Sequence, residues 1–186
     1  MKFKQIEKEL KLFAHKVIEA ARKNLKRKKK ITTGQLYKSL TSKVVPQKDS
    51  VLLQFKMEDY GVFVDRGVKG KDPSALPDKA KWKGVQRAPN SPYQFGSMKS
   101  RGLRGAINMW TVQKGVFDKQ IRNKKGQFIP RKSLQFMMSR SIYLAGLEAT
   151  MFFTDPYNKE LRRFAAKFFD AFIIDIDEKL VYEDKK

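Results

Sequence analysis

Two short helical patterns with a β-hairpin pattern between them constrain the fold of this chain more than any other feature. The first pattern covers residues 33–40, where Thr33 can cap a helix whose Leu36 and Leu40 share one face. The second covers residues 60–67 and repeats the one-sided apolar spacing, with a glycine at its end that suits a left-handed exit from the helix. The chain is therefore expected to form a hairpin framed by two small helices.

The residues between these two segments predict the strands of that hairpin. Residues 44–45 form the first strand, residues 47–50 the turn, and residues 51–57 the second strand, in which apolar and polar side chains alternate. Alternation with a period of two indicates that one face of the hairpin is buried. We expect Tyr60 and Phe63 to pack against that face.

Long amphipathic helices are predicted at both ends of the chain. The N-terminal helix covers residues 3–25, and the C-terminal helix begins with Asp155 as its N-cap. Two further helices are expected at residues 103–114 and 133–146, and the apolar cluster at residues 136–138 is expected in the core. The predicted buried residues of the C-terminal helix are Leu161, Phe164, Phe168, Phe172 and Ile176.

The order and spacing of these elements resemble a family of tailed-bacteriophage neck proteins, which join the phage head to its tail. Members of the family carry an N-terminal helix, a T-G-x-L-x-x-S segment, a hairpin and a Y-A-x-Y-V-E-x-G-T segment. The second motif is departed from at four positions, which are Gly61, Phe63, Asp65 and Val68. The similarity covers residues 1–68 and resumes more weakly after residue 130. The residues that match or closely replace the motif positions are Thr33, Gly34, Leu36, Ser39, Tyr60, Phe63, Val64 and Gly67.

The resemblance implies a fold, a function and a set of partners. The fold would be α+β, with a small antiparallel sheet packed against long N- and C-terminal helices and with a long, basic, loop-rich insertion. The function would be structural: a twelvefold or sixfold ring in the head–tail connector of the virion, joining portal-side and tail-side components around the DNA channel. The partners would be further copies of the chain, adjacent portal, adaptor or tail proteins, and phage DNA contacted without sequence preference. The protein would assemble in the cytoplasm of the bacterial host.

A single neck-like domain is expected over residues 1–186, with residues 69–129 as an insertion or extended arm. Positive charge is concentrated there: from Arg66 to Lys132 there are 17 basic and three acidic residues, a balance of +14 in a chain whose net charge is +22. Residues 69–101 are rich in Pro, Gly, Ser and Lys. They predict an extended loop with too few apolar residues to be ordered in the isolated subunit.

Basic and aromatic side chains are interleaved in this insertion, which suggests a contact surface. They can form a stacking platform for single-stranded nucleic acid, or they can anchor the loop on a neighbouring subunit, and the resemblance favours the second alternative. The aromatic candidates for such an anchor are Trp82, Tyr93 and Phe95. The basic candidates for contact with channel DNA or a neighbouring subunit are Lys69, Lys71, Lys81, Lys83, Arg87, Arg101, Arg104, Lys124 and Lys125.

The sequence contains no recognisable active site. Histidine occurs once, at His15, cysteine is absent, and no phosphate-binding or nucleophile motif is present. Asp175, Asp177 and Glu178 form a carboxylate cluster of the kind that attracts Mg²⁺, but helical residues two positions apart point in different directions. We therefore expect no catalysis, no metal and no cofactor.

Two other classes of protein stay open. A stand-alone, non-specific nucleic-acid-binding or packaging protein would fit the pI of about 10.1, although no nucleic-acid-binding motif is present. A nuclease would have only the weak carboxylate cluster to support it. The sequence shows no signal peptide, and its apolar runs are too short to span a bilayer, so a soluble protein without membrane contact is expected.

Overall fold

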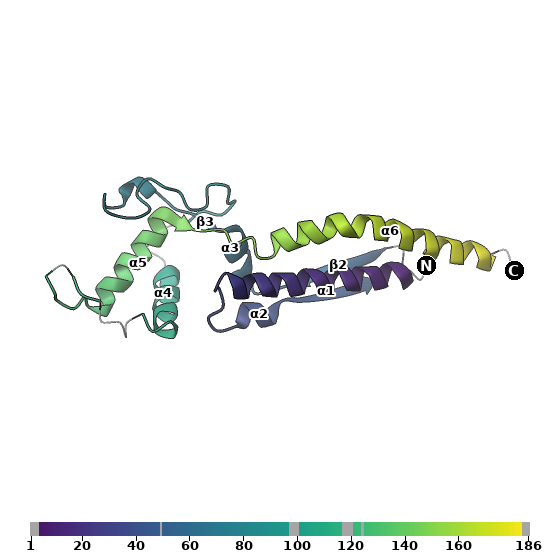
Figure 1. The fold of residues 1–186 in the computed structure, drawn as a ribbon, viewed down its shortest axis with the longest axis horizontal. Helices are drawn as coiled ribbons and strands as arrows, with labels where there is room; N and C mark the ends of the chain where they lie inside the picture. Colours follow the sequence, from purple (N-terminus) through teal and green to yellow (C-terminus); the bar gives the residue numbers. More distant parts are fainter. Residues whose placement is uncertain (1–3, 49, 97–100, 117–120, 124, 184–186) are drawn as a thin grey trace. The chain divides into compact units, whose positions relative to one another are not determined.

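A computed structural model gives the chain an α+β fold (Figure 1). The chain divides into two compact units, the first made of residues 1–59 and 151–186 and the second of residues 60–150. The second unit contains the whole of the predicted insertion at residues 69–129 and extends beyond it at both ends. The residues that the structure describes are 4–48, 50–96, 101–116, 121–123 and 125–183.

Two long antiparallel helices and a β-hairpin make up the first unit. The helices α1 and α6 lie side by side in opposite directions, and the hairpin runs along them (Figure 1). The two strands pair antiparallel, with Thr41 opposite Lys56. The predicted N-terminal helix and hairpin are confirmed, and the C-terminal helix begins at Thr154, one residue before the predicted cap Asp155. The elements of the first unit are α1 (Lys4–Arg27), α2 (Gln35–Ser39), β1 (Thr41–Pro46), β2 (Val51–Lys56) and α6 (Thr154–Glu183).

Aromatic rings hold α1, α6 and the hairpin together. Phe13 of α1 is buried, and its ring centroid lies 4.9 Å from that of Phe164 on α6 and 6.3 Å from that of Phe55 on β2. The ring of Phe55 also lies 5.3 Å from Phe153 and 6.0 Å from Tyr157. Each such pair contributes about 0.5–1.5 kcal/mol beyond the burial of its surface. Val51, Leu53 and Phe55 of β2 are the half-buried residues of the strand, as the alternation predicts.

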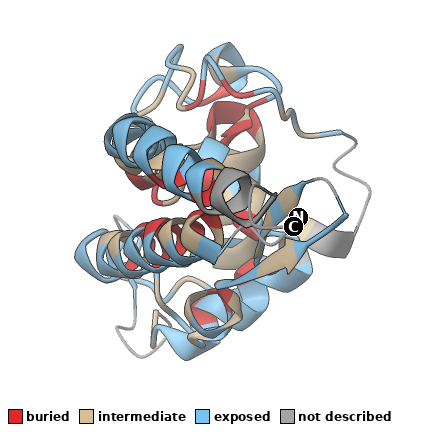
Figure 2. Cartoon of the chain, turned by 90° about the vertical axis from the view of Figure 1, so that its right-hand side faces the viewer, coloured by how far each residue is buried: buried red, intermediate tan, exposed pale blue. Residues whose placement is uncertain are grey.

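Buried and half-buried residues lie on one side of each long helix, and most of the remaining helical surface is exposed (Figure 2). On α6, Phe164 and Phe168 pack in the core as predicted. Leu161 and Phe172 are 41% and 39% exposed, so the predicted stripe is wrong at these positions, and Ala171 is buried instead. Apolar residues occur on several faces of α6, and their spacing alone does not select the buried face. The buried residues of α1 are Ile6, Leu10, Phe13, Ala14, Val17, Ile18, Ala21 and Leu25.

A carboxylate on α6 caps the N-terminus of α1. The backbone N–H groups of Gln5 and Ile6 donate to the two carboxylate oxygens of Asp175, each at 3.0 Å. N–H groups in the first turn of a helix have no partner within the helix, and a negative charge there also faces the positive end of the helix dipole. Asp175 is only 4% exposed. Its role is therefore structural, and this contact fixes the register of α6 along α1.

The second unit contains two longer helices, a small sheet and a long irregular segment. Strands β3 and β4 pair antiparallel, with Val68 opposite Leu147. Helices α4 and α5 pack against each other, and the predicted helices at residues 103–114 and 133–146 are confirmed. The elements of the second unit are α3 (Gly61–Arg66), β3 (Val68–Lys69), the 3₁₀ helix η1 (Pro73–Ala75), α4 (Arg101–Gln113), α5 (Arg131–Ala145) and β4 (Gly146–Leu147).

The short helices α2 and α3 lie at the predicted positions, with one correction at the start of α2. Helix α3 ends at Gly67, whose φ of 73° is the left-handed exit that the sequence predicts. The N-cap position of α2 is occupied by Gly34, with a φ of 79°, rather than by Thr33. The hydroxyl of Thr33 still accepts a bond from the N–H of Gln35, at 3.4 Å.

The irregular segment at residues 70–96 packs on its own unit. Leu76 is 4% exposed and contacts Leu144 and Ala145 of α5. The expectation of an unpacked loop at residues 69–101 is therefore wrong for the part of it that the structure describes. The segment has few apolar residues, but Leu76 among them is buried by a helix that follows much later in the chain.

Glycine allows two backbone segments to approach closely where β3 meets β4. A Cβ on Gly70 would clash with the carbonyl oxygen of Leu144, and a Cβ on Gly146 would lie 2.6 Å from the carbonyl oxygen of Val68. Gln86 braces this crossing, because its amide accepts from the N–H of Gly70 at 2.7 Å and donates to the Gly70 carbonyl at 3.0 Å. A residue with a side chain does not fit at either glycine without a shift of the backbone.

The expectation that Tyr60 and Phe63 are buried core residues is wrong. Tyr60 is 42% exposed and Phe63 is 40% exposed, so neither ring is a fully buried core residue. The ring of Phe63 lies 4.8 Å from that of Tyr93, at 75° to it. The one-sided spacing of residues 60–67 identifies a packing face but not the residues on which that face packs.

The cap on α1 can be tested with Asp175→Asn, which we expect to destabilise the first unit by about 1–2 kcal/mol. The amide offers one oxygen to two N–H groups and loses the charge that faces the helix dipole. Denaturant unfolding followed by circular dichroism measures the change. Asp177→Asn, on the exposed side of the same helix, is the matched control and should change stability by less than about 0.5 kcal/mol. Equal stability of the two variants would contradict the cap.

The glycine crossing can be tested with Gly70→Ala, which we expect to destabilise the second unit by about 1–3 kcal/mol because of the backbone clash. Gly105→Ala is the control, since its Cβ would meet nothing within 4 Å, and Ala in a helix stabilises by about 0.5–1 kcal/mol relative to Gly. Limited proteolysis should cleave residues 70–96 faster in Gly70→Ala only. Unchanged cleavage in that variant would show that the crossing is not needed to hold the segment.

Candidate interaction surfaces

Lys83, one of the basic contact candidates, is engaged inside the irregular segment. Its Nζ donates to the carbonyl oxygens of Ser74 and Leu76, both at 2.7 Å, and lies 3.2 Å from the carboxylate of Asp78. These partners take up the three donors of an ammonium group. The primary role of Lys83 is therefore to close the turn that contains η1.

Arg87 is a second basic candidate with a role inside the fold. Its guanidinium lies over the ring of Trp82, 4.7 Å from the centroid, and pairs with the carboxylate of Glu148 at 3.2 Å. The Arg87 side chain is 21% exposed, and Trp82 packs beneath it on the buried cluster around Leu76. A cation held over an aromatic face in this way stabilises the loop by about 0.5–1 kcal/mol or more.

The three aromatic candidates all make contacts within the second unit. Trp82 packs on the Leu76 cluster, Tyr93 contacts Phe63, and the ring of Phe95 lies 6.1 Å from that of Tyr143. Each is half-buried, so part of each ring is still open to a partner. Their role as anchors between subunits stays a prediction.

The remaining basic candidates differ in exposure. Lys71, Lys81 and Lys125 are exposed, and Lys69 on β3 is half-buried. The Nζ of Lys81 lies 4.9 Å from the centroid of Trp82, on the outside of the loop. Arg101 and Arg104 lie on α4, but their side chains are outside the described part of the structure, and Lys124 lies outside the described residues altogether.

The second unit also exposes apolar side chains that the sequence did not single out. Arg122 lies over the ring of Phe128, 4.2 Å from its centroid, in the turn between α4 and α5. The core position expected for residues 136–138 is wrong for Phe136 and Met137, because the helix turns these two side chains outward. The large apolar residues exposed on α4, α5 and the turn between them include Met109 (64%), Val112 (54%), Phe128 (54%), Phe136 (43%) and Met137 (47%).

The distal half of α6 is a second exposed surface, of opposite charge. Phe169 and Ile173 are 64% and 55% exposed, and they lie one turn apart on the outer face of the helix. Asp170 and Asp177 are exposed beside them, whereas Asp175 points inward to α1. This half of the helix therefore presents both carboxylates and apolar side chains.

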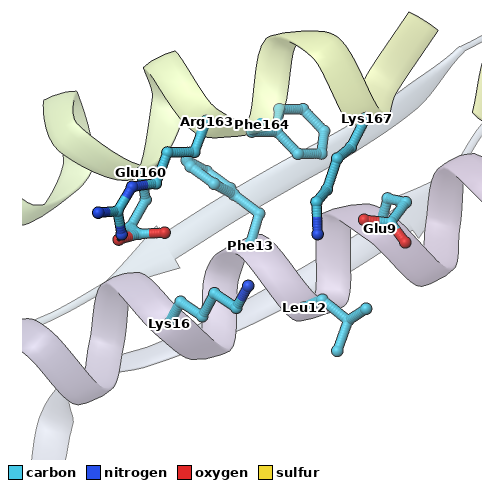
Figure 3. Close-up of a pocket in the computed structure, with 8 residues that line it drawn as sticks. All are labelled: Glu9, Leu12, Phe13, Lys16, Glu160, Arg163, Phe164 and Lys167. Atoms are coloured by element: carbon cyan, nitrogen blue, oxygen red, sulfur yellow. The ribbon is translucent and has the colours of Figure 1, made fainter. Parts of the chain in front are cut away.

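An open groove of about 350 Å³ runs between α1 and α6 (Figure 3). Phe13 and Phe164 form its base, and Leu12 lies at its edge. Glu160 pairs with Arg163 at 2.9 Å on one rim. None of the eight lining residues is a Ser, Thr, Cys or His, so the groove offers no hydroxyl or thiol nucleophile and no histidine base. The charged residues around it are Glu9, Lys16, Glu160, Arg163 and Lys167.

The described residues do not assemble a metal site or a membrane-spanning helix. Within the ranges the structure describes, no group of three or more His, Cys, Asp or Glu side chains is placed to hold a metal ion. The imidazole of His15 is exposed and lies 3.4 Å from the carboxylate of Glu19 on the same helix. Over the same ranges, no helix is both long enough and apolar enough to cross a bilayer.

Comparisons with protein-family models, with curated proteins and with solved structures find no match to this chain. The interpretation of its function therefore depends on its own residues and their arrangement. Among the motif residues, Leu36 is buried in α2, and the hydroxyl of Ser39 accepts from the N–H of Glu58 at 3.0 Å and donates to the Leu36 carbonyl at 3.1 Å. Ser39 thus ties α2 to the end of the hairpin, which makes its role a structural one.

The exposed lysines of the second unit lead to a prediction about DNA. The free protein should bind duplexes without sequence preference, with a log–log salt slope of about −0.9 per phosphate contact. Neutralising three lysines of the second unit to Gln should make that slope less negative by up to about 2.7, whereas the control should change it little. The test variant changes Lys71, Lys81 and Lys125, and the control changes Lys4, Lys8 and Lys16 on α1.

If the two triple variants change this slope equally, binding to DNA depends on the net charge of the protein and not on the lysines of the second unit. A salt-resistant affinity for one sequence would require contacts to base edges, which a general channel contact does not provide.

Proposed function

We propose that this chain is a structural, non-enzymatic virion protein that forms a ring in the head–tail connector of a tailed phage. The ring would join portal-side and tail-side components around the channel through which the DNA passes. It would consist of twelve or six copies, assembled in the cytoplasm of the bacterial host.

The observation that carries this proposal is the order of elements around the hairpin. A long helix is followed by the short helix α2, the hairpin β1–β2 and the short helix α3, which ends at the left-handed Gly67. This is the order that the resemblance to neck proteins implies. A Cβ on Gly67 would lie 2.5 Å from the carbonyl oxygen of Leu147, so this motif position requires glycine.

The distribution of charge supports a place beside DNA. The second unit holds 18 Lys and Arg against five Asp and Glu, a balance of +13 within the total of +22. A channel must pass any sequence, so contacts to phosphate suit it and contacts to bases do not. Exposed lysines such as Lys71, Lys81 and Lys125 meet that requirement without any groove-reading element.

A stand-alone nucleic-acid-binding protein is the second candidate, and its support is the exposed pair of Arg122 and Phe128. Cations beside aromatic rings are typical of surfaces that bind single strands. Trp82 is one of the aromatic residues considered for base stacking, but Arg87 and Lys81 lie over its ring and its body packs on the Leu76 cluster. The parts of the ring that these groups cover are closed to a base, which weakens the stacking alternative.

Mass measurement and negative-stain microscopy of the purified protein test the proposal. We expect a discrete oligomer of six or twelve 21.6-kDa chains that appears as a closed ring without added DNA. A matched sample treated with nuclease controls for assembly on contaminating nucleic acid. A protein that stays monomeric at every concentration and coats single strands would instead support the stand-alone nucleic-acid-binding candidate.

A further inference from the structure

The distal half of α6 is chemically unlike the rest of this cationic chain. Residues 168–178 hold four carboxylates and no Lys or Arg, although the chain as a whole carries +22. Asp175 is used to cap α1, which leaves Asp170 and Asp177 exposed. Between them, Ile173 is 55% exposed, and the three residues lie along one side of the helix at i, i+3 and i+7. Phe169, at 64% exposure, lies beside this line and widens its apolar part.

Helix α5 of the second unit presents the complementary arrangement. Lys132, Phe136 and Arg140 are exposed and follow one another at i, i+4 and i+8 on one face. Met137, 47% exposed, lies beside Phe136. This face of α5 therefore carries a basic, an aromatic and a second basic residue in order. The exposed side of α6 carries an acidic, an aliphatic and a second acidic residue.

The spacing of charge along the two stripes also matches. At a rise of about 1.5 Å per residue, Asp170 and Asp177 are about 10.5 Å apart along α6, and Lys132 and Arg140 are about 12 Å apart along α5. Two helices packed side by side could therefore form both charge pairs at once, with the apolar residues between them. An aromatic and aliphatic centre flanked by charge pairs is the usual anatomy of a protein interface.

We propose that the α6 stripe (Phe169, Asp170, Ile173 and Asp177) docks on the α5 stripe (Lys132, Phe136, Met137 and Arg140) of a second copy of this chain. This inference rests on the proposed function, because it names the contact by which copies join. Charge complementarity selects a second copy as the occupant: nucleic acid would be repelled by the α6 stripe, which has no cation. The two stripes differ, so the contact is heterologous. Each copy contacts one neighbour through its α6 stripe and the other neighbour through its α5 stripe, as ring formation requires.

Charge reversal on each stripe separately tests the contact. Variant one is Asp170→Lys with Asp177→Lys, and variant two is Lys132→Glu with Arg140→Glu. All four side chains are exposed, so both variants should fold, which circular dichroism and thermal unfolding check. The control, Glu58→Lys with Asp59→Lys, changes net charge by the same amount as variant one at two exposed positions that belong to neither stripe.

The expected result is specific to a heterologous contact. Each variant alone should shift the wild-type oligomer to the 21.6-kDa monomer, and the control should assemble as the wild type does. An equimolar mixture of the two variants should assemble again, because the reversed α6 stripe of one fits the reversed α5 stripe of the other. Combining all four substitutions in one chain should also restore assembly.

The outcomes separate this contact from the proposed function. Rings that persist in both variants would overturn the contact and leave the ring proposal standing. Wild-type assemblies that are open chains, lost in each variant and restored in the mixture, would support the contact and contradict the ring. A wild-type protein that is monomeric at every concentration would contradict both.

Discussion

The antiparallel packing of α1 on α6 is the constraint on which the rest of the structure depends. The first and last parts of the chain must meet to bury the Phe13 ring against Phe164, and Asp175 fixes the register by capping α1. The hairpin then covers the pair through Phe55. Because the first unit is built from both ends of the chain, everything from residue 60 to residue 150 is inserted between its halves.

The same constraint explains which surfaces stay open. The inner stripe of α6 is used by α1 and the hairpin, so its outer apolar residues, Phe169 and Ile173, have no cover within the described part of the chain. In the second unit, α5 uses its C-terminal part to bury Leu76, and its N-terminal part keeps Phe136 and Met137 exposed. The proposed contact between copies uses these exposed apolar groups, because contiguous apolar patches often mark interaction sites.

Local patterns predicted the elements of this fold well, and partners distant in sequence account for what they missed. The period of α1, the alternation in β2 and the left-handed Gly67 are properties of neighbouring residues, and all three are confirmed. In the sequence Asp175 stands out only through its neighbours Asp177 and Glu178, which suggest a weak Mg²⁺ site. Its partners in the structure, Gln5 and Ile6, lie at the other end of the chain. No local pattern could have identified that cap.

The same limit applies to the candidate surfaces. Residues 69–96 looked unpacked because the residues that bury Leu76 come from α5, and because the close approach at Gly70 depends on Gly146. The engagement of Lys83 and Arg87 inside the fold likewise depends on carbonyl, carboxylate and aromatic groups that only the folded loop brings together. A count of basic residues identifies the cationic region. It does not tell which lysines and arginines bind groups within the fold and which are exposed to solvent.

Hydrogen exchange measured on the dissociated and the assembled protein tests most directly the claim that the outer faces of these helices serve self-assembly. Slower exchange on assembly should appear in residues 131–140 of α5 and residues 168–177 of α6, while the buried stripe of α1 should exchange at the same rate in both states. Added protection elsewhere, with none in these two segments, would contradict the account.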